Sequence, residues 1–245
     1  MLLLRSVLFT VLMFITVVPY ACLVILFGFV NKAFAFRFAQ AWGRLVDRMA
    51  RFLCGLHYVV EGRENLPEQS AVVMSKHSSA YETIMQLVIV PRHSWVLKRE
   101  LIWLPFFGWA LWAMRPIAIN RNAGGGAVQQ VLAQGCDRLA RGMWVIIFPE
   151  GTRMPPGETR RYGMSGVLLA QRAGVPIVPI AHNAGDFWPR RGWCKKAGTV
   201  RFVIGPSVDA AGKEPREVNA EVQAWIEAKV GELRVESGHA PALPL

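Results

Sequence analysis

The sequence predicts an α/β fold in which a largely parallel sheet is flanked by helices, with a membrane-associated helical segment at the N-terminus. A long run without charge opens the chain. Beyond it, short apolar runs typical of buried strands alternate with stretches of helical periodicity, the order expected of parallel strands joined by helices. Hydrophobic residues make up 53% of the 245 residues and charged residues 18%, so the protein is more apolar than an ordinary soluble domain.

The N-terminal apolar run covers residues 7–30 and is long enough to cross the hydrocarbon core of a bilayer. A cleaved signal peptide is the competing interpretation, but the run exceeds the usual apolar core of one and no small-x-small cleavage site follows. Pro19, near the middle, leaves open a bent re-entrant hairpin that enters one leaflet and returns. Because basic residues follow the run, the positive-inside rule places the remaining chain in the cytoplasm.

Residues 32–56 have the pattern of a basic amphipathic helix. At the helical period, one narrow face carries large apolar side chains and a separate face carries arginines; the two sets are Phe38, Trp42, Leu45, Met49 and Phe52, and Arg37, Arg44, Arg48 and Arg51. The pattern is typical of a helix in the headgroup plane, although a surface helix with a solvated charged face also has it. We expect residues 1–55 to form an N-terminal membrane-anchoring unit.

The rest of the chain is predicted to form one α/β domain over residues 56–236, followed by a loose Pro- and Ala-rich tail at 237–245. Short apolar runs predict strands at residues 58–60, 71–75, 144–148, 177–181 and 200–204. Helical periodicity predicts helices near residues 80–90, 124–141, 163–173 and 214–236.

The net charge of +11 predicts anionic partners: nucleic acid, anionic lipid or a phosphorylated substrate. Nucleic acid is disfavoured, because the aromatic residues lie in apolar runs rather than among basic residues. The four cysteines stand singly, without CxxC pairs or histidines at metal-ligand spacing. We therefore expect reduced thiols, and neither a metal site nor a disulfide framework.

His77 is the first candidate catalytic residue, because it follows a predicted buried strand and precedes a helix, where α/β folds bind their ligands. Its imidazole can act as a base at neutral pH, and Glu82, five residues later, could fix its tautomer. A structural histidine is the alternative. Glu82 has an alternative too, since Ser79 and Glu82 also fit a capping box that closes the first turn of a helix.

A nucleophilic serine is not predicted. The run Gly163–Gly166 is one residue too short for a GxSxG elbow. If His77 is a base, the nucleophile belongs to the substrate.

Three further segments have functional and structural interpretations. Pro149–Arg153 combines an acid, a glycine, a hydroxyl and a guanidinium, which suits phosphate binding but also a turn with a surface ion pair. Arg115–Arg121 and Val175–Pro179 are equally explained as strands, the second with prolines at its ends. The aromatic-rich segment 95–112 suits an acyl groove, membrane contact or core packing.

The segment that begins at His77 and the segments that end at Arg121, Arg153 and Pro179 occur in a fixed order. This order resembles that of a family, the glycerolipid acyltransferases related to 1-acyl-sn-glycerol-3-phosphate acyltransferase. The first motif of that family, His-x4-Asp, corresponds to His77-x4-Glu82, and the second, ending in Ile-x-Arg, to Ile119–Arg121. The third, Phe-Pro-Glu-Gly-Thr-Arg, is complete at Phe148–Arg153, and the fourth, Val-Pro-Ile-Val-Pro, at Val175–Pro179. Glu82 departs from the commoner aspartate, and lipid A acyltransferases also resemble this pattern, although the complete third motif favours glycerolipids.

The resemblance implies a membrane-bound enzyme that moves a fatty acyl group from acyl-CoA or acyl-carrier protein to the sn-2 hydroxyl of lysophosphatidic acid, giving phosphatidic acid. His77 is then the general base and Glu82 orients it. The phosphate is bound by Arg121, Glu150, Gly151, Thr152 and Arg153, with help from Lys98. The acyl-donor or acyl-chain region is formed by Val175, Pro176, Ile177, Val178 and Pro179.

No metal or cofactor is expected beyond the acyl donor, and the bacterial inner membrane is the expected location, with the catalytic domain on its cytoplasmic face. Two alternatives stay open. The acceptor could instead be glycerol 3-phosphate, another lysophospholipid or a lipid A precursor, or the protein could be a non-catalytic binder of anionic lipid.

Overall fold

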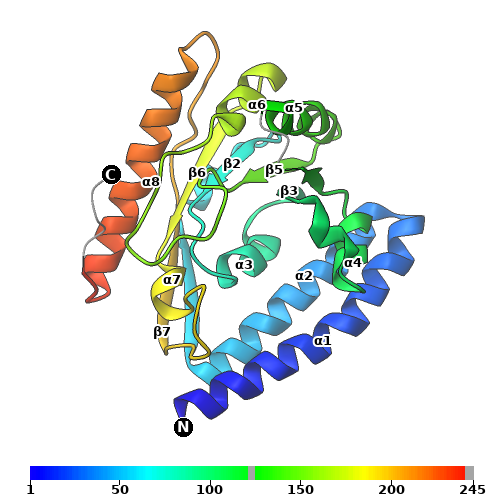
Figure 1. Ribbon diagram of the computed structural model, residues 1–245, viewed down its shortest axis with the longest axis vertical. Helices are drawn as coiled ribbons and strands as arrows, with labels where there is room; N and C mark the ends of the chain where they lie inside the picture. The colour runs from blue at the N-terminus through cyan, green and yellow to red at the C-terminus, as the bar shows by residue number, and fades with distance from the viewer. Residues whose placement is uncertain (121–124, 241–245) are drawn as a thin grey trace.

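The computed structural model describes residues 1–120 and 125–240, and within them the chain forms a seven-stranded sheet covered by helices (Figure 1). The strands lie in the order β1-β7-β6-β2-β5-β3-β4. Every neighbouring pair is parallel except β6 and β7. The strands are β1 Leu56–Glu61, β2 Val72–Ser75, β3 His93–Lys98, β4 Ile117–Ile119, β5 Trp144–Ile147, β6 Ile177–His182 and β7 Gly198–Ile204. The predicted α/β class with a largely parallel sheet is confirmed.

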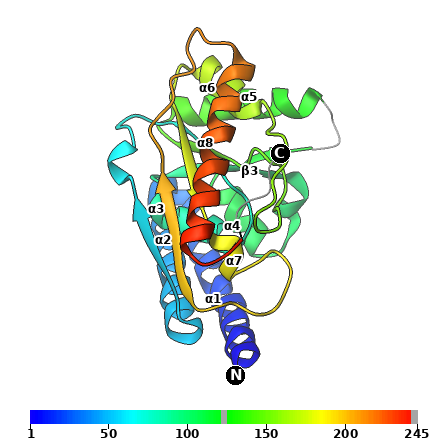
Figure 2. The same ribbon diagram turned by 90° about the vertical axis from the view of Figure 1, so that its left-hand side faces the viewer.

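Helices cover both faces of the sheet (Figures 1 and 2). They are α1 Leu2–Val30, α2 Lys32–Met49, α3 Tyr81–Ile89, α4 Phe107–Ala113, α5 Gly125–Ala140, α6 Ser165–Ala173, α7 Ala184–Phe187 and α8 Pro215–Glu236. Alternate residues of each strand point to opposite faces. Val73 and Ile146 therefore belong to the core under α1 to α4, and their neighbours Val72 and Val145 to the core under α5, α6 and α8.

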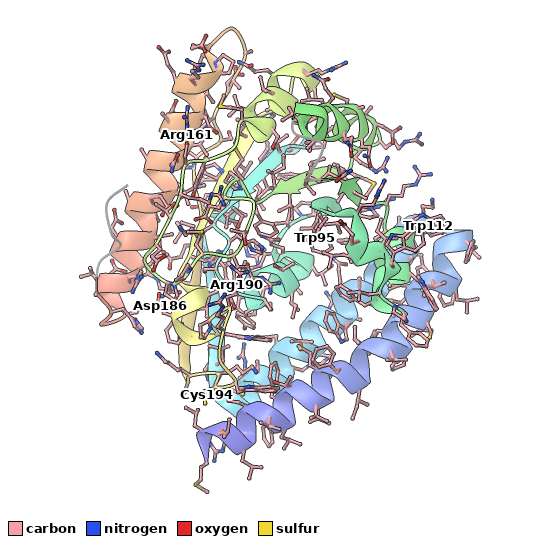
Figure 3. All side chains as sticks on the ribbon, in the orientation of Figure 1. Trp95, Trp112, Arg161, Asp186, Arg190 and Cys194 are labelled. Atoms are coloured by element: carbon pink, nitrogen blue, oxygen red, sulfur yellow. The ribbon has the colours of Figure 1, made fainter. Side chains whose placement is uncertain are left out.

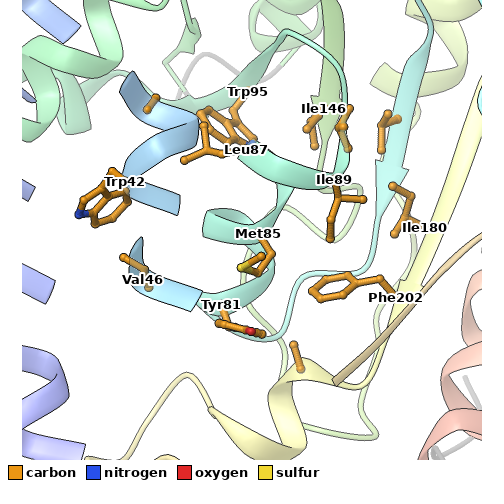
Figure 4. Packing of buried hydrophobic residues seen from close by; sticks show 14 of the residues in the cluster. Trp42, Val46, Tyr81, Met85, Leu87, Ile89, Trp95, Ile146, Ile180 and Phe202 are labelled. Carbon is orange, nitrogen blue, oxygen red and sulfur yellow. The ribbon is translucent and has the colours of Figure 1, made fainter. Parts of the chain in front are cut away.

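Helix α3 joins the N-terminal helices to the sheet. Figure 4 shows it between α2 and the strands, with Tyr81 toward Val46 and Ile89 toward Ile146 and Ile180. The Tyr81 hydroxyl donates a hydrogen bond to Asp47 of α2 over 3.1 Å. The helix that follows His77 is thus held on both sides.

The first two helices run antiparallel and pack along each other (Figure 1). Helix α1 continues through Pro19, and the chain reverses at Asn31, whose side chain caps α2 by accepting hydrogen bonds from two amides. The possible bend at Pro19 is therefore absent, and the chain turns twelve residues later, at Asn31. Both ends of α1 contact the α/β domain: Ser6 accepts a hydrogen bond from the Lys195 amide, and Gly28 lies against Ala113 of α4.

The buried face of α2 differs from the predicted one. The buried apolar side chains are Ala35, Phe36, Ala39, Trp42 and Val46, followed by Ala50 in the next turn. Of the predicted apolar face, Phe38 and Met49 are only half-buried and Phe52 is 89% exposed. Alanines allow close approach of α1, and the π-helical turn Ala50–Cys54 shifts the register and turns Phe52 outward. The four predicted arginines are exposed as expected.

The predicted tail is partly placed. Ser237 accepts a hydrogen bond from Asn183, and the His239 ring lies edge-on to Phe187. Residues 241–245 lie outside the described residues.

Candidate active site

His77 lies at the carboxyl edge of the sheet, in the segment between β2 and α3. Strands β2 and β5 are parallel neighbours, so their carboxyl ends meet at one edge. This topology places His77 beside the turn Phe148–Arg153 that follows β5. The imidazole stacks on the Phe148 ring with centroids 3.8 Å apart and an interplanar angle of 18°.

Glu82 contacts His77 directly, because Oε1 lies 2.7 Å from Nδ1. The carboxylate is fully buried, and its Oε2 has no hydrogen-bond partner among the described residues. The predicted capping box does not form: Ala80 precedes the helix without a side-chain cap, and Ser79 accepts from the Tyr81 amide. Of the two interpretations of Glu82, the structure therefore excludes the capping box and shows the contact with His77.

This contact decides which imidazole nitrogen can react. A carboxylate only accepts hydrogen bonds, so Nδ1 carries the proton and Nε2 keeps its lone pair. The His77 side chain is 14% exposed and lines a cavity that is partly open to solvent. Nε2 is therefore the nitrogen available to a substrate hydroxyl.

The backbone of Lys76 and His77 is held at all four of its polar groups. The Lys76 amide donates to the Ile180 carbonyl, and the Lys76 carbonyl accepts from the buried His182 ring. The His77 amide donates to Oε2 of Glu150 over 2.9 Å, and the His77 carbonyl accepts from the Met154 amide over 2.7 Å. Because all four groups are paired, the backbone that carries the imidazole has a fixed position.

Glu150 is placed differently from the expectation that it binds phosphate. Its buried carboxylate accepts from the Lys76 ammonium over 2.7 Å and from the His77 amide. Burial raises the pKa of Glu150 from 4.5 to about 6, because desolvation outweighs the attraction of Lys76. The side chain therefore supports the His77 turn instead of facing a substrate.

Arg153 is the best-placed candidate for binding an anion. It lines the same cavity as His77, and its Nε is buried without a hydrogen-bond partner among the described residues. Its carbonyl accepts a hydrogen bond from Arg190 over 2.9 Å, which brings a second guanidinium to this turn (Figure 3). A buried N–H without a partner is costly, and a phosphate oxygen would satisfy it.

The other predicted phosphate ligands are placed less directly. Lys98 lines the cavity but is about half exposed and pairs with Glu100 at 3.4 Å. Gly151 has a φ of 68°, which lets the turn follow β5 tightly, and Thr152 is half-buried beside it. Arg121 lies outside the described residues.

The cavity has a volume of about 650 Å³ and a largely apolar wall. Helices α1 to α4 and strand β3 line it, and its charged or titratable groups among the described residues are Tyr20, His77, Lys98 and Arg153. Trp95, Leu97 and Phe106 from the aromatic-rich segment are part of the wall. The same segment also exposes Trp103, Trp109 and Trp112, the last at the periphery of α4 (Figure 3). Segment 95–112 thus lines the cavity, packs in the core and reaches the surface.

The segment Val175–Pro179, expected to form the acyl-donor or acyl-chain region, lies in and just before a buried strand. Ile177, Val178 and Pro179 belong to β6, a buried strand between β2 and β7, and Val175 and Pro176 lead into it. None of the five lines the cavity. Pro176 directly precedes β6 and Pro179 lies within it. The strand interpretation is confirmed, and the acyl-binding role of the segment stays a prediction.

Three residues of this site could hardly be recognised from the sequence. Lys76 directly precedes His77, yet a lysine at a strand end is ordinarily solvated. Phe148 was assigned to a motif without a role for its ring. Arg190 belongs to a basic stretch outside the four motifs.

Known acyltransferases are similar to this chain in sequence. A sequence model of the acyltransferase family matches residues 57–183. The chain is 45% identical to a 1-acyl-sn-glycerol-3-phosphate acyltransferase of Pseudomonas aeruginosa over 197 residues, 79% of this chain and 77% of the relative. It is 30% identical to the protein of that name from Salmonella typhimurium over 234 residues, 91% and 93% of the two chains.

The fold also matches a solved structure, the 1-acyl-sn-glycerophosphate acyltransferase from Thermotoga maritima. The TM-score is 0.79 and the alignment covers 95% of each chain, at 23% sequence identity. The site and the matches together define an acyltransferase, an enzyme. The chain belongs to the acyltransferase family, among the relatives of 1-acyl-sn-glycerol-3-phosphate acyltransferase.

Proposed function

We propose that the protein transfers a fatty acyl group to the sn-2 hydroxyl of 1-acyl-glycerol 3-phosphate, giving phosphatidic acid, with His77 as general base and Glu82 orienting it. One observation carries the proposal: the His77 imidazole, held by Glu82 over 2.7 Å, opens into an apolar cavity that Arg153 also lines. A base, an anion site and a lipid-sized space therefore meet at one place. The relatives named above support this choice of acceptor.

The proposed step is direct transfer. Nε2 of His77 takes the proton of the acceptor hydroxyl as its oxygen attacks the thioester carbonyl. The tetrahedral intermediate collapses with cleavage of the C–S bond, and the imidazolium returns the proton to the leaving thiolate. Glu82 stabilises the imidazolium between these events, as a carboxylate does in serine-enzyme triads.

Arg153 would hold the phosphate and so position the hydroxyl near Nε2. Lys98 and Arg121 are proposed to assist. Positioning of this kind can supply several kcal/mol of barrier reduction. Gly151 and Thr152 would shape the turn from which Arg153 extends.

The cavity would take an acyl chain. Its volume of about 650 Å³ and its wall of aliphatic and aromatic side chains suit a hydrocarbon chain rather than a polar group. The chain would then lie along α1, α3 and α4, with its carbonyl end toward His77. The acyl donor is proposed to be acyl-CoA or acyl-carrier protein.

The N-terminal helices are proposed to hold the enzyme on the membrane. Helix α1 is long and apolar enough to cross a bilayer, and only 17% of its most apolar window is buried. Because both of its ends contact the α/β domain, we favour helices that enter the near leaflet from the cytoplasmic side of the bacterial inner membrane. The exposed tryptophans of segment 95–112 would lie at the interface.

A panel of acceptors tests the function. Purified protein in detergent is incubated with acyl-CoA or acyl-carrier protein and with lysophosphatidic acid, glycerol 3-phosphate, a neutral-headgroup lysophospholipid or a lipid A precursor, and free thiol release is followed. We expect lysophosphatidic acid to stand out with at least one donor. Preference for another acceptor would overturn the acceptor, and no thiol release with any of them would favour the non-catalytic lipid binder.

A further inference from the structure

Lys76 is a buried lysine with two carboxylate partners. Its side chain is 2% exposed. Nζ donates to Oε1 of Glu150 over 2.7 Å, to Oε2 of Glu227 over 2.9 Å and to the Glu158 carbonyl over 2.8 Å. These three groups match the three N–H bonds of the ammonium, so the lysine is fully committed within the protein.

The same carboxylate that binds Lys76 also binds the catalytic turn. Oε1 of Glu150 faces Lys76, and Oε2 accepts the His77 amide over 2.9 Å. A continuous chain of contacts therefore runs from Glu227 on α8 through Lys76 and Glu150 to the backbone of His77. Helix α8 lies outside the four family motifs and outside the matched residues 57–183.

Glu227 is itself held in place. The Tyr162 hydroxyl donates to Oε1 of Glu227 over 2.6 Å. The Tyr162 backbone is bound to α8 at both polar groups, by Gln223 and Asn219. The carboxylate that α8 presents to Lys76 thus has a fixed position.

From this geometry we propose that Lys76 and Glu227 are positioning residues: they fix Glu150, and through it the His77 turn, so that the imidazole stays aligned with Glu82 and the cavity. The inference rests on the proposed function. It gives α8 a part in catalysis without contact with the substrate, and it assigns Glu150 to the support of the base.

Positioning makes a distinct kinetic prediction. Displacing a catalytic group by about 1 Å can cost roughly 100-fold in rate, while binding of the lysolipid through Arg153 is unaffected. Loss of the Glu227 charge should therefore lower kcat and leave KM for lysophosphatidic acid nearly unchanged. A phosphate-binding role for this network would instead raise KM.

The test compares Glu227→Gln with Glu221→Gln, a matched control on an exposed position of the same helix. We expect E227Q to lower kcat by about tenfold or more with KM changed by less than about threefold, and E221Q to match the wild type. The proposal is overturned if E227Q keeps wild-type kcat, or if it raises KM alone. Should E227Q melt far below the wild type, the charge-conserving Glu227→Asp is measured instead, and the same criteria for kcat and KM apply to it.

A second pair of variants tests the coupling. Lys76→Met leaves two buried carboxylates without their cation, a strongly unfavourable arrangement, so its kcat should fall further than that of E227Q. Adding Glu227→Gln to Lys76→Met removes one of those charges and should recover part of the lost kcat; strictly additive effects would overturn the proposal. A wild-type enzyme that releases no thiol with lysophosphatidic acid would instead contradict the proposed function.

Discussion

Nδ1 of His77 lies 2.7 Å from Oε1 of Glu82, and the glutamate that makes this contact stands in the first turn of α3, where it is fully buried. A carboxylate is favoured at the beginning of a helix by the helix dipole. The helix therefore supplies both the rigid support and the electrostatic setting for the charge that orients the base.

Glu82→Gln separates orientation from capping. A glutamine serves a capping box as well as a glutamate does, so a capping role predicts unchanged activity. Orientation of an imidazolium needs the carboxylate charge, and we expect kcat to fall by about 10²–10⁴-fold. Glu82→Asp should keep measurable activity. Melting curves of both variants show whether the fold is intact, and a wild-type rate for E82Q would refute orientation by Glu82.

Arg153→Ala should weaken binding of phosphate-bearing acceptors. A hydrogen bond to a charged group contributes about 1.5–3 kcal/mol, which corresponds to roughly 10- to 150-fold in kcat/KM. The matched control is Arg172→Ala, an exposed arginine on α6. Steady-state kinetics with lysophosphatidic acid and with uncharged monoacylglycerol provide the measurement. Equal losses with both acceptors would show that Arg153 does not bind phosphate.

The buried Glu150 predicts a pH dependence of stability. Its pKa is raised from 4.5 to about 6, because desolvation dominates. The stability that this group contributes is fully present below pH 4.5 and is lost as the pH rises through about 6. The unfolding free energy of the wild type, relative to Glu150→Gln, should therefore fall by on the order of 2 kcal/mol from pH 4.5 to 7. Unfolding curves of both proteins at several pH values provide the measurement. A difference in unfolding free energy that stays flat or rises with pH would contradict the prediction.

Charges on the exposed face of α1 should detach the protein from membranes. Val11 and Ile15 are exposed one turn apart, so Val11→Glu with Ile15→Glu should weaken binding to anionic vesicles by about tenfold or more, since two acids would have to enter the apolar layer. Activity in detergent should be retained. The paired control, Val59→Glu with Val235→Glu, alters exposed valines elsewhere and should bind vesicles as the wild type does in flotation assays. Equal flotation of the two double variants would argue against insertion of α1.

Local patterns predicted five strands because each is an apolar run, and all five occur in the structure. Strand β3 was missed, since His93, Ser94 and Lys98 interrupt its apolar character. Tertiary packing accommodates the polar residues of this strand. The His93 ring is buried against Phe36 and Trp95, and its Nδ1 contacts the Pro91 carbonyl at 2.8 Å. The direction of β7, antiparallel to β6, could not be predicted either, because a strand's own sequence does not encode its partner.

In the site, too, contacts within one segment could be predicted and contacts between distant segments could not. His77 and Glu82 are five residues apart, so their pairing could be predicted from one short segment. Glu150 and Lys76 are 74 residues apart, and the motif alone suggested a phosphate ligand where the fold places a buried ion pair. Long-range contacts between charged groups depend on the order of the strands, which local residue patterns do not fix.

The most direct test of His77 as the general base compares His77→Ala with His57→Ala, a control at an exposed histidine of β1. Both proteins should be folded and should bind vesicles. The measurement is thiol release from acyl-CoA or acyl-carrier protein that depends on lysophosphatidic acid. If His77 is the general base, H57A keeps the wild-type rate and H77A loses at least about 10²-fold. Turnover by H77A near the wild-type rate would contradict this role of His77.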